Sequence, residues 1–260
     1  MKTRIISGLI MVPFLAVLIF GGLVLKLLCI FVAVCGLYEF YKAFHQIDVK
    51  PSFPLGILSI AALYGISFLK WPSEVYLLWI CLCLGACLLY LFDMKRHSIP
   101  AALVTFAGMI YIVFFSFHIV LIDGLKGFEQ FVWMTVIASF VTDIGAYFTG
   151  YYFGRNKLCP AISPKKTVEG AIGGTLCAVI AAGIFGLLFT EGLFFHCLAM
   201  GLLASITSQL GDLSASVFKR HLGIKDYGNL IPGHGGILDR FDSFLFAAPT
   251  VYYYLIFAVV

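Results

Sequence analysis

The sequence predicts an all-α fold, a polytopic integral membrane protein with about nine transmembrane helices. Three observations lead to this fold class. First, the chain of 260 residues is 62% hydrophobic and only 12% charged, with a mean hydropathy of +1.03, whereas soluble domains are about 45–50% apolar and about 25% charged. Second, its apolar residues form long segments. Third, its positive charges gather in alternate connections between those segments.

A spanning helix needs roughly 20 mostly apolar residues, and nine segments qualify as candidate spans. They are residues 5–21, 23–44, 54–70, 75–92, 99–121, 130–152, 170–190, 192–217 and 238–258. The first segment has the charge pattern of a signal peptide, but more apolar sequence follows it at once, so we expect a retained helix. We expect one membrane domain, with N-terminal spans in residues 1–121 and the functional spans and loops in residues 130–260.

The positions of lysine and arginine predict the orientation, because cytoplasmic loops carry an excess of both. With nine spans, 14 of the 17 fall on one side, and only Lys26, Lys70 and Lys126 fall on the other. We therefore expect the N-terminus and the two long polar loops to be cytoplasmic. The formal charge of +4 then reflects topology and does not indicate nucleic-acid binding.

Three spans carry polar residues that lipid-facing helices avoid, since an aspartate at a helix centre costs about 2.5–3.5 kcal/mol on insertion scales. In the span 130–152, Asp143 shares one face with Ser139 and Tyr147. It is either a structural residue with hydrogen-bond partners inside the protein or a substrate or ion contact. In the span 192–217, Gln209 and Asp212 belong to a stripe of polar residues at steps of three and four. This stripe predicts one wall of a polar cavity.

The last span begins with GGILDRFDSF, in which Asp239 and Asp242 are three residues apart and share a face, while Arg240 points elsewhere. Carboxylates at a helix start are favoured by the helix dipole, so capping is one explanation. The other is a site for a hard divalent cation such as Mg²⁺, because Asp212 reaches a similar depth from the preceding helix.

The two long polar loops are basic and contain glycine. The first reads GRNKLCPAISPKKTVEGA, with a predicted turn at Ser-Pro-Lys-Lys-Thr, and the second reads FKRHLGIKDYGNLIPGHGG. Lysines in such loops can reflect topology alone. However, glycines leave backbone N–H groups accessible to a phosphate. Cations, accessible amides and metal-binding carboxylates together suit phosphoryl or nucleotidyl transfer.

From Ser216 the chain reads SVFKRHLGIKDYGNLIPGHGGILDRFD, which resembles the full signature of the phosphatidate cytidylyltransferases, the integral-membrane CDP-diacylglycerol synthases. The resemblance extends upstream to QLGDLSAS, SPKKTVEG and TDIGAYFTGYYFGR. One departure is Val168, where many members have tryptophan. The motifs cover the C-terminal half, and the first half matches only as generic apolar spans.

The resemblance implies that CTP and phosphatidic acid give CDP-diacylglycerol and pyrophosphate, with Mg²⁺ required and the lipid phosphate attacking the α-phosphorus of CTP directly. The partners are then CTP, phosphatidic acid and the lipid bilayer, without nucleic acid. A homodimer would fit the family. The expected location is a bacterial cytoplasmic (inner) membrane, with the active site facing the cytoplasm.

The resemblance and the residue chemistry together assign roles to individual side chains. We expect Asp212, Asp239 and Asp242 to hold the metal, and the cations to balance the phosphates. Those cations are Lys165, Lys166, Lys219, Arg220 and Lys225, of which Lys219 and Arg220 are expected to act in catalysis. Substrate contacts are expected from Ser163, Gly233, Gly235, Gly236, Asp226, Asp143, Gln209 and Arg240. His234 either donates to a phosphate or is a structural loop histidine.

Two other functions compete with the cytidylyltransferase. One is a CTP-dependent lipid-alcohol kinase of related architecture, which would release CDP in place of pyrophosphate. The other is a secondary transporter, suggested by the intramembrane carboxylates. Transporters commonly show inverted repeats, and we find no convincing repeat in this sequence.

Overall fold

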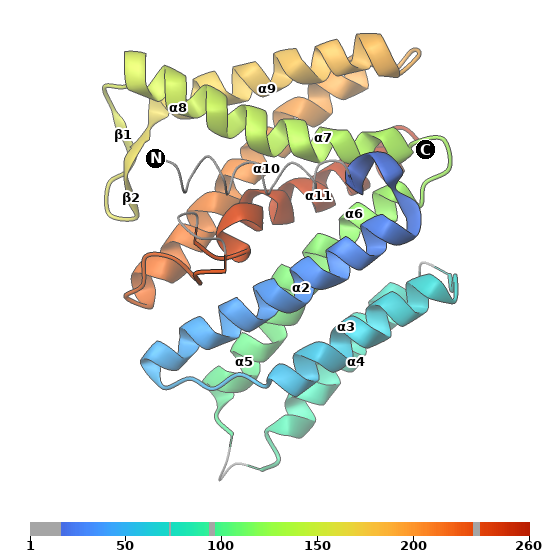
Figure 1. Cartoon of the computed structure of the whole chain (residues 1–260), viewed down its shortest axis with the longest axis vertical. Helices are drawn as coiled ribbons and strands as arrows, with labels where there is room; N and C mark the ends of the chain where they lie inside the picture. Colours follow the sequence, from blue (N-terminus) through green and yellow to red (C-terminus); the bar gives the residue numbers. More distant parts are fainter. Residues whose placement is uncertain (1–16, 73, 94–96, 231–234) are drawn as a thin grey trace. The chain divides into compact units, whose positions relative to one another are not determined.

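The computed structural model describes residues 17–72, 74–93, 97–230 and 235–260. The regular elements in this part of the chain are almost all helical (Figure 1). They are α2 (Gly22–Phe44), η1 (His45–Ile47), α3 (Phe53–Phe68), α4 (Val75–Tyr90), α5 (Ile99–Gly108), η2 (Met109–Phe114), α6 (Phe115–Asp123), η3 (Glu129–Phe131), α7 (Val132–Val136), η4 (Ile137–Val141), α8 (Thr142–Phe153), β1 (Lys157–Cys159), β2 (Ser163–Thr167), α9 (Val168–Phe189), α10 (Phe194–His221) and α11 (Leu238–Ala258).

The predicted class, an all-α polytopic membrane protein, is confirmed. Six helical segments in the described residues are long and apolar enough to cross a membrane. Helices α3 and α4 have 16 residues each, which is shorter than the roughly 20 residues that a full crossing needs. Of the first predicted span, residues 5–21, only residues 17–21 are described. The total of nine spans therefore stays a prediction.

The helix starts follow local sequence signals. The Ser98 side chain accepts a hydrogen bond from the Ala101 N–H at 3.3 Å, with a proline in the first turn of α5. The Thr167 hydroxyl accepts one from the Gly170 N–H at 3.1 Å and caps α9. Serine and threonine caps of this kind satisfy N–H groups that have no partner within the helix.

The chain forms two compact units. The first contains residues 23–117 and 222–240, and the second contains residues 118–221 and 241–260 together with residues 18–22. The signature loop Leu222–Arg240 belongs to the first unit. The expected organisation, with N-terminal spans in residues 1–121 and functional spans and loops in residues 130–260, stays a prediction.

The core of the first unit is built around α2. The Phe40 ring lies edge-on to Tyr111 of η2 and tilted against Tyr227 of the signature loop. The Tyr41 hydroxyl donates to the Thr105 carbonyl oxygen at 2.6 Å. In this way, a buried tyrosine fills apolar space while its hydroxyl keeps a hydrogen-bond partner.

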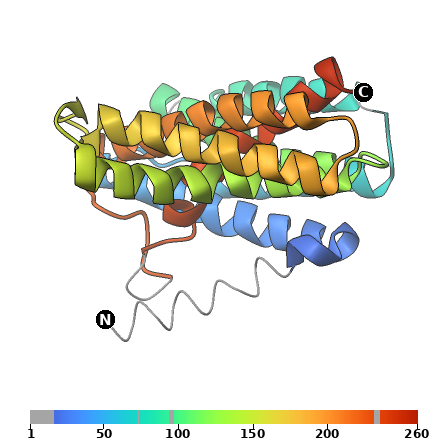
Figure 2. The same ribbon diagram turned by 90° about the horizontal axis from the view of Figure 1, so that it is seen from above.

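The second unit packs α8, α9 and α10 side by side (Figures 1 and 2). Buried residues of α9 at steps of four are small, namely Gly170, Gly174, Ala178, Ala182 and Gly186. The large residues Ile172, Leu176, Ile180, Ile184 and Leu188 are exposed. Small residues let membrane helices approach closely, and the exposed face suits contact with lipid.

Polar side chains also connect these helices in the interior of the unit. Thr142 donates to Ser205 at 2.8 Å, and Ser205 donates to Thr175 at 3.2 Å. The Gln209 amide donates to Thr175 at 2.8 Å and to the Ala171 carbonyl oxygen at 3.3 Å. The predicted polar stripe on α10 is therefore partly a set of interhelical hydrogen bonds, which are favourable where water is excluded.

A two-stranded antiparallel hairpin of β1 and β2 joins α8 to α9 (Figure 1). The sequence analysis did not predict it. The segment Ser163–Thr167, interpreted as a turn, is strand β2, which pairs with β1 and runs directly into α9. Glu169 in the first turn of α9 accepts hydrogen bonds from the N–H groups of Arg155 and Asn156, and so holds the start of the hairpin.

Gly174 provides a test of the close packing in the second unit. A Cβ atom at this position would lie 2.5 Å from the Thr142 carbonyl oxygen and 2.9 Å from the Ala146 Cβ. We expect Gly174→Leu to lower the free energy of unfolding by about 1–3 kcal/mol or more through overpacking. The measurement is thermal unfolding of the purified protein in detergent. Ile172→Leu on the exposed face is the matched control, and equal melting of the two variants would contradict this packing.

Candidate functional site

The second unit contains a cavity of about 560 Å³, a size typical of small-ligand sites. It lies among α8, the hairpin, α9 and α10. Its lining includes the predicted site residues Asp143, Lys165, Lys166, Gln209 and Asp212, together with Tyr147, Tyr151, Lys157 and Thr167. The structure thus brings together predicted residues from three separate motifs.

The hairpin supplies the positive side of the cavity. Lys157 pairs with Thr167 across the two strands, and Lys165 and Lys166 lie just before Thr167 on β2. All three lysines line the cavity. Because Thr167 also caps α9, the strand, the helix start and the lysines are held as one structure.

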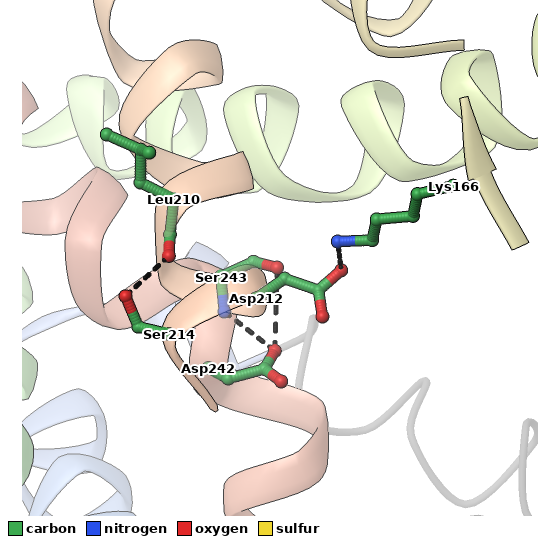
Figure 3. Close-up of polar contacts among 6 residues, drawn as sticks. All are labelled: Lys166, Leu210, Asp212, Ser214, Asp242 and Ser243. Carbon is green, nitrogen blue, oxygen red and sulfur yellow. Dashed lines mark hydrogen bonds and ion pairs between the residues drawn. The ribbon is translucent and has the colours of Figure 1, made fainter. Parts of the chain in front are cut away.

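Asp212 of α10 forms an ion pair with Lys166 (Figure 3). The side chains keep 29% and 27% of their exposure, so solvent reaches both. Charge-assisted pairs of this kind are stronger than neutral hydrogen bonds. The pair keeps the ammonium group of Lys166 beside the polar stripe of α10.

Asp242 of α11 lies near Asp212 (Figure 3), and Lys219 and Asp143 are its other charged neighbours. It is only 7% exposed. Its carboxylate accepts a hydrogen bond from the Ser243 N–H at 2.8 Å. The neighbouring carboxylates of Asp212 and Asp242 repel each other when both are charged, and a cation between them would relieve that repulsion.

The described residues contain no group of three or more His, Cys, Asp or Glu side chains arranged to hold a metal ion. Asp212 and Asp242 nevertheless supply two neighbouring carboxylates within the second unit. Mg²⁺ is usually held by one or two carboxylates together with substrate phosphates, so this pair fits the ion. The third predicted ligand, Asp239, belongs to the first unit.

The C-terminal end of α10 is fastened to the hairpin. The Nε atom of Arg220 donates to the Ile162 carbonyl oxygen at 3.1 Å, beside Ser163 at the start of β2. Ser163 itself does not line the cavity. The basic end of α10 and the basic hairpin therefore lie at the same end of the second unit.

The signature loop in the first unit is organised by Asp239. One carboxylate oxygen accepts hydrogen bonds from the Tyr227 N–H at 2.8 Å and the Gly236 N–H at 3.0 Å. The Gly236 amide, predicted to contact a phosphate, is therefore used within the loop. Gly235 has a φ of +85°, which suits glycine where the chain turns into α11.

The remaining predicted residues of this loop differ in their exposure to solvent. Lys225 and Asp226 are exposed, and Arg240 is half-buried. Gly233 and His234 lie outside the described residues. Their expected contacts with phosphate stay predictions.

Three functional candidates were missed by sequence reasoning. Lys157 and Tyr151 line the cavity, and Lys157 could have been included because it belongs to the same basic loop as Lys165. The third is Glu39, a buried acidic residue of α2. An ionisable residue within an apolar span was a sufficient signal.

Comparison with known proteins agrees with this geometry. A family model described as the cytidylyltransferase family matches residues 2–258. Two proteins named phosphatidate cytidylyltransferase, from Staphylococcus haemolyticus and Staphylococcus aureus, are 35% and 34% identical to this chain, and each alignment covers 96% of this chain and 97% of the relative. One of the same name from Bacillus subtilis is 48% identical over 126 residues, which is 48% of this chain and 47% of that protein. The chain belongs to the cytidylyltransferase family.

Proposed function

We propose that this protein transfers the cytidylyl group of CTP to phosphatidic acid, which gives CDP-diacylglycerol and pyrophosphate. Family membership and the curated relatives over almost the whole chain support this reaction. The structural observation that carries the proposal is the cavity of the second unit, which is lined by three lysines and by Asp212, with Asp242 beside Asp212. A membrane protein with a phosphate-suited cavity can accept one substrate from water and the other from lipid.

In this reaction a phosphate oxygen of phosphatidic acid forms a bond to the α-phosphorus of CTP. The bond from that phosphorus to the bridging oxygen breaks, and pyrophosphate leaves with the electron pair. The work of the protein is positioning and neutralisation of phosphate charge. Lys157, Lys165 and Lys166 supply positive charge from the hairpin, and Lys219 and Arg220 supply it from the end of α10.

Asp212 and Asp242 are the residues that would hold Mg²⁺. The bound ion would neutralise charge on the phosphate oxygens. Lys166 then has two alternative anionic partners, the Asp212 carboxylate and a substrate phosphate. Exchange between these partners would keep its ammonium group at the site throughout turnover.

The distribution of positive charge supports a cytoplasmic position for the site. The hairpin and the basic end of α10 are at one end of the second unit, and cytoplasmic segments are rich in lysine and arginine. We propose a bacterial inner membrane as its location, and the bacterial origin of its relatives supports this proposal. A homodimer stays a prediction, which light scattering of the detergent-solubilised protein would test.

The reaction is tested by incubating the purified protein in detergent with CTP, phosphatidic acid and Mg²⁺. We expect CDP-diacylglycerol and pyrophosphate in equal amounts, and no product after chelation of Mg²⁺. Release of CDP together with a phosphorylated lipid alcohol would instead indicate the kinase. Absence of both products, together with gradient-driven uptake by proteoliposomes, would favour a transporter.

Asp242→Asn tests the carboxylate pair. The amide has nearly the same shape and can still accept the Ser243 N–H, but it removes the negative charge beside Asp212. We expect turnover per folded molecule to fall by about two orders of magnitude, the effect of removing a group that stabilises charge in the transition state. Asp48→Asn is the control, because Asp48 is exposed and has a φ of 56°, which asparagine adopts readily. Equal turnover of the two variants would exclude a role for Asp242.

Lys166→Ala tests the positive side of the cavity. Hydrogen bonds to charged groups contribute about 1.5–3 kcal/mol, so we expect kcat/KM for CTP to fall by roughly 10- to 150-fold. The matched control is Lys126→Ala, which alters an exposed lysine on the opposite side in the predicted topology. If both variants keep wild-type kcat/KM, Lys166 does not contact the nucleotide or its reacting phosphates.

A further inference from the structure

The first unit contains a buried acidic residue outside the cavity just described. Glu39 lies in the last two turns of α2 and is only 6% exposed. The surrounding sequence, CGLYEFYKAF, is otherwise apolar up to Lys42. A carboxylate in such a setting is costly unless hydrogen bonds or charges compensate for its burial.

The Glu39 carboxylate binds the start of α11, about 200 residues away in the sequence. Its two oxygens accept hydrogen bonds separately, one from the Ile237 N–H at 3.0 Å and one from the Leu238 N–H at 2.8 Å. N–H groups at a helix start have no partner within the helix. A negative charge there is favoured both by charge-assisted hydrogen bonds and by the helix dipole.

Two glycines of the signature loop make room for this carboxylate. A Cβ atom at position 228 would lie 2.6 Å from one Glu39 oxygen, and one at position 236 would collide with the other. The adjacent residue of α2, Phe40, packs against Tyr227. Residues of the signature loop therefore pack directly around the Glu39 carboxylate.

A second carboxylate completes the arrangement from within the loop. Asp239 accepts the N–H groups of Tyr227 and Gly236, and Glu39 accepts the next two N–H groups along the chain, those of Ile237 and Leu238. Consecutive amides from 236 to 238 are thus bound by two carboxylates. The path of the backbone into α11 is determined by this pair.

We infer that Glu39 is a positioning residue for the signature loop and the first turn of α11. It is not among the residues that line the cavity. It holds the first turn of α11, which carries Asp239, and Asp242 follows one turn later in the same helix. The inference rests on the proposed function for its effect on turnover. The anchoring itself can be measured without turnover.

The test combines two measurements on Glu39→Gln. A glutamine amide presents one acceptor oxygen and one NH₂ group, so one of the two backbone N–H groups loses its acceptor. We expect hydrogen–deuterium exchange of fragments containing Ile237 and Leu238 to be about tenfold faster or more. We also expect kcat per folded molecule to fall by about tenfold or more, with unchanged exchange in α8, α9 and α10.

Gly228→Ala disturbs the same contact from the loop side and keeps the test valid if Glu39→Gln does not fold. We expect the same pattern of faster local exchange and lower kcat. Two matched controls alter the same residue types elsewhere. They are Glu129→Gln at an exposed glutamate and Gly65→Ala, where a Cβ atom meets nothing within 4 Å.

The outcomes separate the two claims. Faster exchange at the start of α11 with wild-type kcat would overturn the positioning role, since the contact would then be structural only. Unchanged exchange would overturn the anchor itself, and equally faster exchange throughout the protein would show general destabilisation in place of positioning. If wild-type protein forms no CDP-diacylglycerol, the proposed function fails, while the exchange measurement still tests the anchor.

Discussion

The cost of placing a carboxylate among apolar helices is the constraint on which both units depend. A buried charge loses its hydration. It must therefore gain hydrogen bonds or an opposite charge within the protein. Four acidic residues that are buried or partly buried meet that requirement in two ways. Glu39, which is buried, and Asp239, which is half-buried, accept backbone N–H groups. Asp212 forms an ion pair with Lys166, and Asp242 accepts the Ser243 N–H and has Asp212 and Lys219 among its charged neighbours.

These two solutions have different consequences for function. A carboxylate that accepts backbone N–H groups at a loop or helix start holds the chain in place, and it cannot leave without releasing those donors. A carboxylate paired with a lysine can exchange that partner for another charged group, such as a phosphate-bound cation. The first kind therefore suits the construction of the site, whereas the second kind suits the chemistry.

The packing of the second unit explains why the basic hairpin is held firmly at the end of a membrane bundle. Small residues of α9 allow α8 and α10 to approach closely, so the cavity is bounded by rigid helices. Thr167 and Glu169 then fix the hairpin to the first turn of α9, and Arg220 ties it to α10. Three lysines are thereby held on one rigid frame, which reduces the cost of ordering them around phosphates.

Much of the fold and part of the site followed from the sequence alone. Hydropathy determined the helices, because lipid excludes unpaired backbone groups, and the polar residues at Asp143, Gln209 and Asp212 marked the cavity, because charge within a span needs a reason. Only the tertiary structure decided which distant segments meet. The hairpin depends on pairing between strands too short to show a clear pattern, and the signature loop packs against α2 through Tyr227 and Phe40. Glu39 acts on amides about 200 residues away, and no local pattern encodes that distance, because hydrogen bonds depend on position in space and not on separation along the chain.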